Sequence, residues 1–574
     1  MKVIKRDGSV MSFEKEKIFN AVSKANTDLP IDDKIPEEYI TAITTAVVRK
    51  CEEFNTSLHV EEIQDLVEKE IMSVGYYAAA KAYVIYRYKR TLARQNKTLT
   101  EKLTASNVQN QNANVDEASF GGRLGEAASY VTKQYAMEHL MSKMAVRNHL
   151  NNEIYTHDLD HYALGDHNCL SIPFDRLLAD GFNTRQTDVR PAGSINTAFQ
   201  LFAVIFQLQS LQQFGGVAAT HLDWTMVPYV RLSFWKHYKD GLEFISKKAL
   251  ENTPTKEEIK LMPIDGLLYS DAEASKYAMR KTLEELNQAV EGMYHNLNTL
   301  QSRSGCQLPF TSINYGTCTL TEGRMVIKAL IDGCIKGVGK FHRTSIFPCG
   351  IFQCMKGINR KPGDPNYDMF RLALKSTAQR IYPNYANVDW SNAAGYDPEN
   401  PETYFSTMGC RTANLADINA EDHKLVQLKD GRGNICPVTI ILPTLAMQAK
   451  SPATFIDLLS KKIEEAKDQL IERFEWICSQ SPSAARFMYE NNTMYGYKPE
   501  EGIRSALKHG TLAIGQLGLA ECLQILLGCD HTDPRGMEFA KIIEDLFKTK
   551  CAAFKRAYKL NFGVYYTPKH CWAA

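Results

Sequence analysis

Apolar residues recur three or four positions apart in several long segments of the chain, which is the spacing of one face of a half-buried helix. Near the N-terminus this pattern predicts helices at 39–51, 60–76 and 78–94, and a helical stretch that opens at Phe13. A long stripe farther along predicts another amphipathic helix, and its members are Leu283, Leu286, Val290, Met293, Leu297 and Leu300.

Short apolar runs alternate with helical patterns in the rest of the chain. The segments 308–315 (LPFTSINY) and 438–442 (VTIIL) are short, contain β-branched residues and are bounded by glycine or proline, so they are predicted to be strands. Helices interspersed with strands over more than 400 residues favour an α/β barrel or a large doubly wound sheet.

The first 95 residues are predicted to form a separate small domain. Their helical pattern gives way at 96–111 to a polar stretch without hydrophobic periodicity, which we interpret as a linker. The remaining segment, 112–574, is then the main α/β body of the protein.

The composition is that of a globular protein. Of the 574 residues, 44% are hydrophobic and 23% are charged, and the formal net charge is +1. This balance excludes a disordered chain and disfavours a protein that coats nucleic acid. No N-terminal apolar run has signal-peptide length, so we expect a cytoplasmic protein with reduced thiols and neither a nucleic-acid nor a membrane partner.

The longest uncharged segment, 191–220, contains many Asn and Gln side chains, which would be costly to place in lipid. It is predicted to contain a buried helix or a helix at a subunit interface. The glycine-rich stretch at 213–216 (QFGG) lacks the Lys and Ser/Thr of a phosphate-binding P-loop and is predicted to be a helix C-cap.

Several frequent kinds of catalytic or metal site have no motif in this chain. No C-x-x-C pair, G-x-S-x-G, Walker A motif or H-E-x-x-H occurs. The pairs His157–Asp158 and Asp166–His167 offer metal-ligating atoms, but His and Asp are common in surface turns. We therefore predict no metal site from the sequence.

The segment from Val3 to Gly8 places two cations, Lys5 and Arg6, and a turn glycine beside the start of a helix. A nucleoside triphosphate would find charge and backbone donors there. A solvated hairpin turn is the alternative, and these residues alone favour it.

Two of the 14 cysteines lie in polar, glycine-punctuated settings. Cys169 ends the stretch GDHNC, and Cys410 lies in STMGCR. Each one, taken singly, fits a small buried apolar side chain, and neither has a histidine partner in sequence that would indicate a cysteine protease. A thiol can also act by hydrogen-atom transfer, because its S–H bond is close in strength to an activated sugar C–H bond.

Segments along nearly the whole chain resemble the anaerobic (class III) ribonucleoside-triphosphate reductase family, in the family's order. They are NANVDEASFGGR (112–123), EIYTHDLDHYALGDHNCL (153–170), QQFGGVAATHLD (212–223), SRSGCQLPFTSINYGT (302–317), FPCGIFQCMKGINRKPGDPNYDMF (347–370), YFSTMGCRTANL (404–415), KHGTLAIGQLGLAE (508–521) and FGVYYTP (562–568). At the N-terminus, VIKRDGSVMSFEKEKI and AKAYVIYRYKR resemble the ATP-cone, a regulatory domain that binds ATP or dATP.

The resemblance implies a fold and a set of functional residues. The fold would be a ten-stranded α/β barrel of two antiparallel five-stranded halves, of the glycyl-radical type, preceded by a small, mostly helical ATP-cone. A finger loop would carry the radical cysteine, Cys410, whose thiyl takes the ribose 3′-hydrogen, and Cys169 would be its partner thiol. Met408 and Asn168 would lie at the substrate and formate site. The nucleotide contacts of the ATP-cone would be Val3, Lys5, Arg6 and Lys17.

The same resemblance implies cofactors and partners. The substrates would be ribonucleoside triphosphates, the final reductant formate, and the effectors ATP, dATP and other deoxyribonucleoside triphosphates. Members of the family are dimers, carry a structural zinc, and receive a glycyl radical from an iron–sulfur, S-adenosylmethionine activating enzyme.

The chain departs from the family pattern at several positions. The R-x-C-G-Y loop of the glycyl radical and the cysteine pairs of the zinc site are absent, and the chain ends in KHCWAA, so we expect 112–574 to be a C-terminally incomplete barrel. Ile441 replaces an active-site Asn, and Gln516 replaces a large apolar residue. These departures keep open a truncated form that binds nucleotides without turnover. Another glycyl-radical enzyme is a weaker alternative, because it would not need an ATP-cone.

Overall fold

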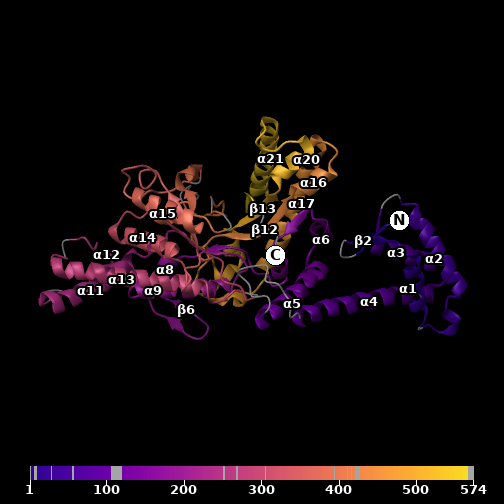
Figure 1. Ribbon diagram of the computed structural model, residues 1–574, viewed down its shortest axis with the longest axis horizontal. Coiled ribbons are helices and arrows are strands. Elements are labelled where there is room, and N and C mark those ends of the chain that lie inside the picture. The colour runs from indigo at the N-terminus through magenta and orange to yellow at the C-terminus, as the bar shows by residue number, and fades with distance from the viewer. Residues whose placement is uncertain are drawn as a thin grey trace. The chain divides into compact units, whose positions relative to one another are not determined.

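The computed structural model describes residues 2–5, 9–27, 29–54, 57–104, 119–249, 253–266, 269–303, 306–393, 395–409, 412–414, 416–420 and 427–566, without the side chains of 95–104 and 391–393. The chain divides into two compact units, Met1–Ala105 and Ser106–Ala574 (Figure 1). No helix in these described ranges combines the length and the apolar character needed to cross a membrane.

The N-terminal unit is mostly helical, as the sequence predicts. Its helices are α1 (Lys15–Thr27), α2 (Glu37–Glu52), α3 (Val60–Ser73) and α4 (Tyr77–Thr104). A three-stranded sheet in the order β2-β1-β3 completes it, from β1 (Lys2–Ile4), β2 (Val10–Ser12) and β3 (Leu58–His59). Helix α4 continues to Thr104, so the first part of the expected linker at 96–111 is helical even though it lacks an apolar stripe.

The larger unit begins with α5 (Phe120–Tyr135), α6 (Lys143–Leu150) and α7 (Leu159–Tyr162) and contains a five-stranded parallel sheet in the order β11-β10-β9-β8-β5. The strands are β5 (Leu170–Ser171), β8 (Val217–Ala219), β9 (Thr311–Tyr315), β10 (Cys349–Cys354) and β11 (Asn384–Asn387). Helices connect successive strands, as parallel pairing requires. They are α8 (Phe174–Asp180), α9 (Ile195–Ser210), α10 (Leu222–Thr225), α11 (Val227–Gly241), α12 (Lys256–Leu261), α13 (Ala272–Leu297), α14 (Thr321–Lys336) and α15 (Tyr367–Arg380).

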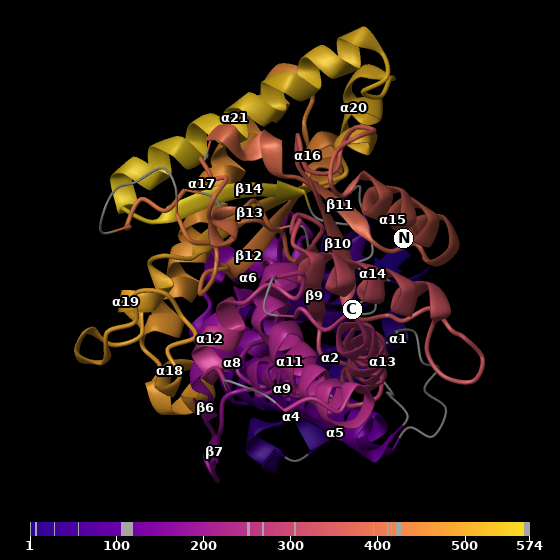
Figure 2. The same cartoon turned by 90° about the vertical axis from the view of Figure 1, so that its left-hand side faces the viewer.

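A second sheet has the order β14-β13-β12-β4. Strands β12 (Asn434–Ile441), β13 (Thr511–Leu517) and β14 (Asn561–Tyr566) are parallel, and β4 (Ile154–Thr156) runs antiparallel to β12. The helices of this half are α16 (Leu442–Gln448), α17 (Pro452–Cys478), α18 (Arg486–Glu490), α19 (Arg504–Leu507), α20 (Leu519–Leu527) and α21 (Pro534–Tyr558). Figure 2 shows α17 and α21 lying along these strands.

Backbone hydrogen bonds join the two sheets in antiparallel register. The amides of Cys169 and Ser171 donate to the carbonyls of Asn434 (2.8 Å) and Arg432 (2.9 Å), and the Gly431 amide donates back to Ser171 (2.8 Å). We call this pairing of 168–171 with 431–435 the seam. It confirms an α/β fold with two antiparallel halves. Among the described residues one sheet has five strands and the other has four, so closure into a ten-stranded barrel remains a prediction.

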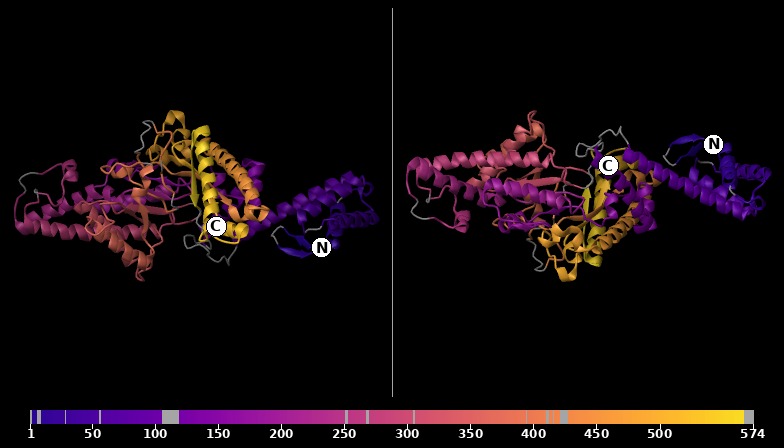
Figure 3. Two further views of the ribbon diagram at one scale, coloured as in Figure 1. Left: turned by 90° about the horizontal axis from the view of Figure 1, so that it is seen from above. Right: turned by 90° about the horizontal axis from the view of Figure 1, so that it is seen from below.

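The apolar patterns predict most helices but only parts of the strands. In α13, which packs beside α9 and α11 (Figure 3), Leu286, Val290, Met293 and Leu297 are buried, whereas Leu283 is exposed and Leu300 lies beyond the helix end. Strand β9 starts only at Thr311, and the segment before it contains Pro309, which has no N–H for a ladder. Strand β12 begins four residues before the predicted start, in a segment whose Asn, Cys and Pro resemble a turn.

The seam leaves no room for a side chain at Gly433, where an added Cβ would lie 1.9 Å from the Cys169 carbonyl oxygen. We therefore expect Gly433→Ala to lower the free energy of unfolding by about 1–3 kcal/mol or more, measured as a lower urea midpoint. The matched control is Gly292→Ala, because an added Cβ on this exposed position of α13 meets nothing within 4 Å. An unchanged midpoint for Gly433→Ala would contradict the tight seam.

Candidate active site

Cys169 lies at the seam, directly before β5, and its side chain is 2% exposed. It forms a buried cluster with Ala218 of β8 and Met408, although 239 positions separate the cysteine from the methionine. The Cys169 thiol lies 3.3 Å from the Asn168 side-chain oxygen, which accepts its hydrogen bond. The fold therefore brings together three of the four residues that the sequence assigned to the reaction site, namely Cys169, Asn168 and Met408.

The QFGG stretch packs around Asn168 and is not the predicted helix C-cap, because α9 already ends at Ser210. The Gly215 amide and the Gln213 side-chain amide both donate to the Asn168 carbonyl, each at 2.9 Å. A Cβ on Gly215 would lie 1.9 Å from the Asn168 side-chain oxygen. The glycine is needed here for close approach to the residue before the cysteine.

Side chains from β9 and β10 hold the segment 405–409 against the five-stranded sheet. Asn314 bonds both backbone groups of Thr407, accepting from its N–H at 3.1 Å and donating to its carbonyl at 2.9 Å. Ser312 accepts from the Gly409 amide at 3.1 Å, and Gln353 donates to the Phe405 carbonyl at 2.9 Å. Four backbone groups of this segment thus have side-chain partners, whereas an unpaired polar group inside the protein would be costly.

The returning arm of this segment pairs with the outgoing one. Thr407 and Ala413 form an antiparallel bridge, and the Met408 amide donates to the Thr412 carbonyl at 3.0 Å. Asn414 then donates to the Ser171 hydroxyl (2.7 Å) and to the Arg432 carbonyl (2.8 Å), which anchors the arm to the seam. Cys410 lies outside the described residues. We call 404–414 the loop.

A third thiol, which the sequence did not single out, lies beside the loop. Cys349 starts β10, and its sulfur lies 3.3 Å from the Tyr382 hydroxyl. A Cβ on Gly409 would be 3.4 Å from that sulfur. The registers β10–β9 and β9–β8 place Cys349, Ser312 and Ala218 in one row, which is the signal that relates Cys349 to the loop.

Three polar side chains at the second sheet contact one another, the buried His157 and Thr439 and the half-buried Tyr565. The imidazole of His157 lies 2.7 Å from the Thr439 hydroxyl and 3.1 Å from the Tyr565 hydroxyl. Burial, with a smaller contribution from Arg473, lowers the pKa of His157 to about 3, so the ring is neutral. The candidate ligand pairs of the sequence are engaged elsewhere, because Asp166 bonds His161 at 2.8 Å and His167 contacts the sulfur of Met488 at 3.0 Å.

The two departures at 441 and 516 fall on opposite faces of this sheet. Ile441 is two residues from Thr439, on the same face of β12, and is 4% exposed. Gln516 lies on the helix-facing side of β13, where its amide donates to Glu544 of α21 at 2.7 Å. Gln516 therefore belongs to the packing of α21 and not to the reaction site.

Lys429, next to the seam, was not singled out by the sequence. It is 1% exposed, and its ammonium has no hydrogen-bond partner among the residues that the structure describes. Burial, together with the charge of Arg432, lowers the pKa of Lys429 to about 8. A buried, unpartnered cation of this kind is suited to an anionic ligand.

The ATP-cone candidates lie at the β1–β2 hairpin and at the start of α1. Val3 is in β1 and packs partly against the core of its unit, and the Lys5 amide donates to the Ser9 carbonyl at 2.8 Å. Lys17 forms an exposed ion pair with Glu14 at 2.8 Å, which is a weak interaction that a phosphate can replace. Arg6 lies outside the described residues.

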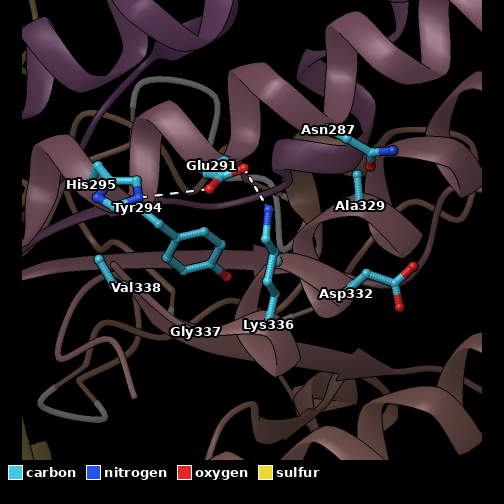
Figure 4. Close-up of a pocket in the computed structure, with 10 residues that line it drawn as sticks. Asn287, Glu291, Tyr294, His295, Ala329, Asp332, Lys336, Gly337 and Val338 are labelled. Atoms are coloured by element: carbon cyan, nitrogen blue, oxygen red, sulfur yellow. Dashed lines mark hydrogen bonds and ion pairs between the residues drawn. The ribbon is translucent and has the colours of Figure 1, made fainter. Parts of the chain in front are cut away.

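A cavity of about 240 Å³ lies between α13 and α14. Figure 4 shows Glu291 between Lys336, which it pairs with at 2.8 Å, and His295, at 3.8 Å. The hydrogen bond from Lys336 lowers the pKa of Glu291, so the pair is charged. The charged groups that line this cavity are all paired, Asp332 with Lys328 outside it, and none of its lining residues is a cysteine, so the loop region is the stronger candidate for chemistry.

Comparisons with known proteins show which family this chain resembles. A family model described as anaerobic ribonucleoside-triphosphate reductase matches residues 111–571, and an ATP cone domain model matches residues 1–92. The anaerobic ribonucleoside-triphosphate reductase of Haemophilus influenzae is 30% identical and covers 92% of this chain and 71% of its own length. The Escherichia coli enzyme of the same name is 29% identical and covers 99% and 76%.

Solved structures show the same fold at low identity. A structure of an anaerobic ribonucleotide reductase matches with a TM-score of 0.58 at 14% identity, covering 82% of this chain and 68% of that one. The anaerobic ribonucleotide reductase from Thermotoga maritima with dATP bound in the specificity site gives 0.55 at 14%, covering 82% and 76%. Since a family model spans most of the chain, this chain belongs to the anaerobic ribonucleoside-triphosphate reductase family and carries an ATP-cone at its N-terminus.

Proposed function

We propose that this chain reduces ribonucleoside triphosphates to deoxyribonucleoside triphosphates by a thiyl-radical mechanism with formate as reductant. The thiyl of Cys410 takes the ribose 3′-hydrogen, the 2′-hydroxyl leaves as water, and Cys169 helps to reduce the substrate radical. The 3′-hydrogen then returns to the sugar. Overall, the nucleotide, formate and one proton give the deoxynucleotide, carbon dioxide and water.

The observation that carries this proposal is the cluster of Cys169 with Met408, two positions before Cys410. Both side chains are 2% exposed, and a shielded site suits radical intermediates, which react with water and oxygen. The rigid hold on Thr407 and Gly409 keeps the loop in register with Cys169. In the family the radical originates on a glycine loop that does not occur in these 574 residues, and an activating enzyme generates it.

The alternative is a form that binds nucleotides without turnover. Ile441 favours it, because this buried apolar side chain cannot make the hydrogen bonds of the Asn that is usual there. Nucleotide binding without deoxynucleotide formation, even when an activated glycyl-radical segment is supplied, would establish this alternative and reject the reductase.

We expect Cys410→Ala and Cys169→Ala to abolish deoxynucleotide formation, because each removes a thiol that exchanges hydrogen with the substrate. The measurement is anaerobic turnover with ¹³C-formate after activation of the chain together with a segment that supplies the glycyl radical, and it follows the deoxynucleotide and the labelled carbon dioxide at a ratio of one to one. Cys529→Ala, a half-buried thiol after α20, is the control and should keep full activity. Full activity of Cys410→Ala would reject the mechanism.

Asn314→Ala removes both hydrogen bonds that hold Thr407. We expect kcat to fall by about 100-fold, the effect of a small displacement of a reacting group, while KM changes little. Asn384→Ala, at an exposed position of β11, is the matched control. Steady-state kinetics that show the same loss in both variants, or none in Asn314→Ala, would contradict a positioning role.

We also propose that Val3, Lys5, Arg6 and Lys17 bind the effector nucleotide. Lys17→Ala should weaken ATP and dATP binding by about 10–100-fold, because a charge-assisted hydrogen bond contributes about 1.5–3 kcal/mol. Isothermal titration calorimetry of the full chain measures this, with Lys24→Ala in the last turn of α1 as control. Equal affinities in both variants would remove Lys17 from the binding site.

A further inference from the structure

A second cavity, of about 330 Å³, lies among α8, α10, α11 and the short 3₁₀ turn Pro401–Thr403. Asp175, His221 and Glu402 line it, and their ligand-capable atoms all lie within 4.8 Å of one another. Asp175 and His221 follow β5 and β8, whereas Glu402 lies on the chain that leads into the loop. The reaction proposed above uses none of these three side chains.

Negative charge exceeds positive charge around this cavity. The Nε2 atom of His221 lies 2.8 Å from a carboxylate oxygen of Asp175. Glu402 also lines the cavity, and Asp430 lies behind His221, where the Thr220 hydroxyl donates to it at 2.7 Å. Acidic side chains therefore outnumber basic ones around His221. The remaining cation of the cavity, Lys260, is paired with Glu257 at 2.8 Å.

A hydrogen-bonded chain behind His221 determines which ring nitrogen faces the cavity. The Thr220 hydroxyl donates its single hydrogen to Asp430 at 2.7 Å, and the same oxygen lies 2.7 Å from Nδ1 of His221. Nδ1 must then be the protonated nitrogen that donates to Thr220, and Nε2 faces Asp175. Histidines that bind metals are commonly oriented in this way, by a hydrogen bond from the other ring nitrogen.

We propose that Asp175, His221 and Glu402 bind a divalent transition-metal cation such as Zn²⁺, Co²⁺ or Mn²⁺. One imidazole nitrogen with carboxylate oxygens suits these ions better than Mg²⁺ or Ca²⁺. On binding, His221 gives its Nε2 proton to solvent and that nitrogen becomes a ligand, while the cavity leaves a position for water. The cation would link the chain that leads into the loop, through Glu402, to the ends of β5 and β8.

The test is an anaerobic titration of the metal-free full chain with Co²⁺, followed by visible absorption and by metal content after gel filtration. Wild type should bind one equivalent more than Glu402→Gln, and Thr220→Val should bind that ion about 10–100-fold more weakly, as loss of an orienting partner does. Glu399→Gln, an exposed carboxylate three positions earlier, should match wild type. Equal Co²⁺ binding in wild type, Glu402→Gln and Thr220→Val would overturn the proposal.

A second measurement needs no variant. X-ray absorption of the wild-type chain loaded with one equivalent of Zn²⁺ should show nitrogen and oxygen ligands at about 2.0–2.2 Å, one of them an imidazole. Sulfur ligands at about 2.3 Å would place the ion on cysteines and reject this site.

Discussion

The backbone hydrogen bonds of the seam are the constraint on which the rest of the larger unit depends. They join Cys169 and Ser171 to the segment 431–434, and they orient the two sheets antiparallel to each other. Such close pairing is possible only because Gly433 has no side chain. The same bonds fix the backbone of Cys169, so the architecture and the position of the thiol are consequences of one contact.

The loop is held by buried polar side chains rather than by apolar packing alone. Asn314 and Gln353 are fully buried, and burying an amide without partners costs free energy. Their hydrogen bonds to the loop backbone offset that cost, and an incorrectly placed loop would lose them. Polar groups inside the protein thus specify one loop position, which a hydrophobic contact would define less sharply.

Local patterns in the sequence predicted what depends on near neighbours. The buried positions of α13 and the C-terminal half of β12 follow from spacing and from β-branched residues, whereas the candidate reaction-site residues came from the family resemblance. Cys349 and Lys429 lay outside this reasoning, because their significance comes from neighbours that are distant in the chain. The role of Gln516 also required the structure, since its partner, Glu544, is on a helix that no motif relates to β13.

The chain before the loop and the end of the loop are both hydrogen-bonded to Lys429. The Lys429 amide donates to the Glu402 carbonyl at 3.0 Å, and the Lys429 carbonyl accepts from Asn414 at 2.7 Å. Because Lys429 lies next to the seam, a displacement of Glu402 would also displace the backbone that pairs with Cys169. A cation bound by Glu402 would therefore restrain the same backbone that places the thiol, and an ion that left the site would release one end of the loop while Asn314 retained the middle.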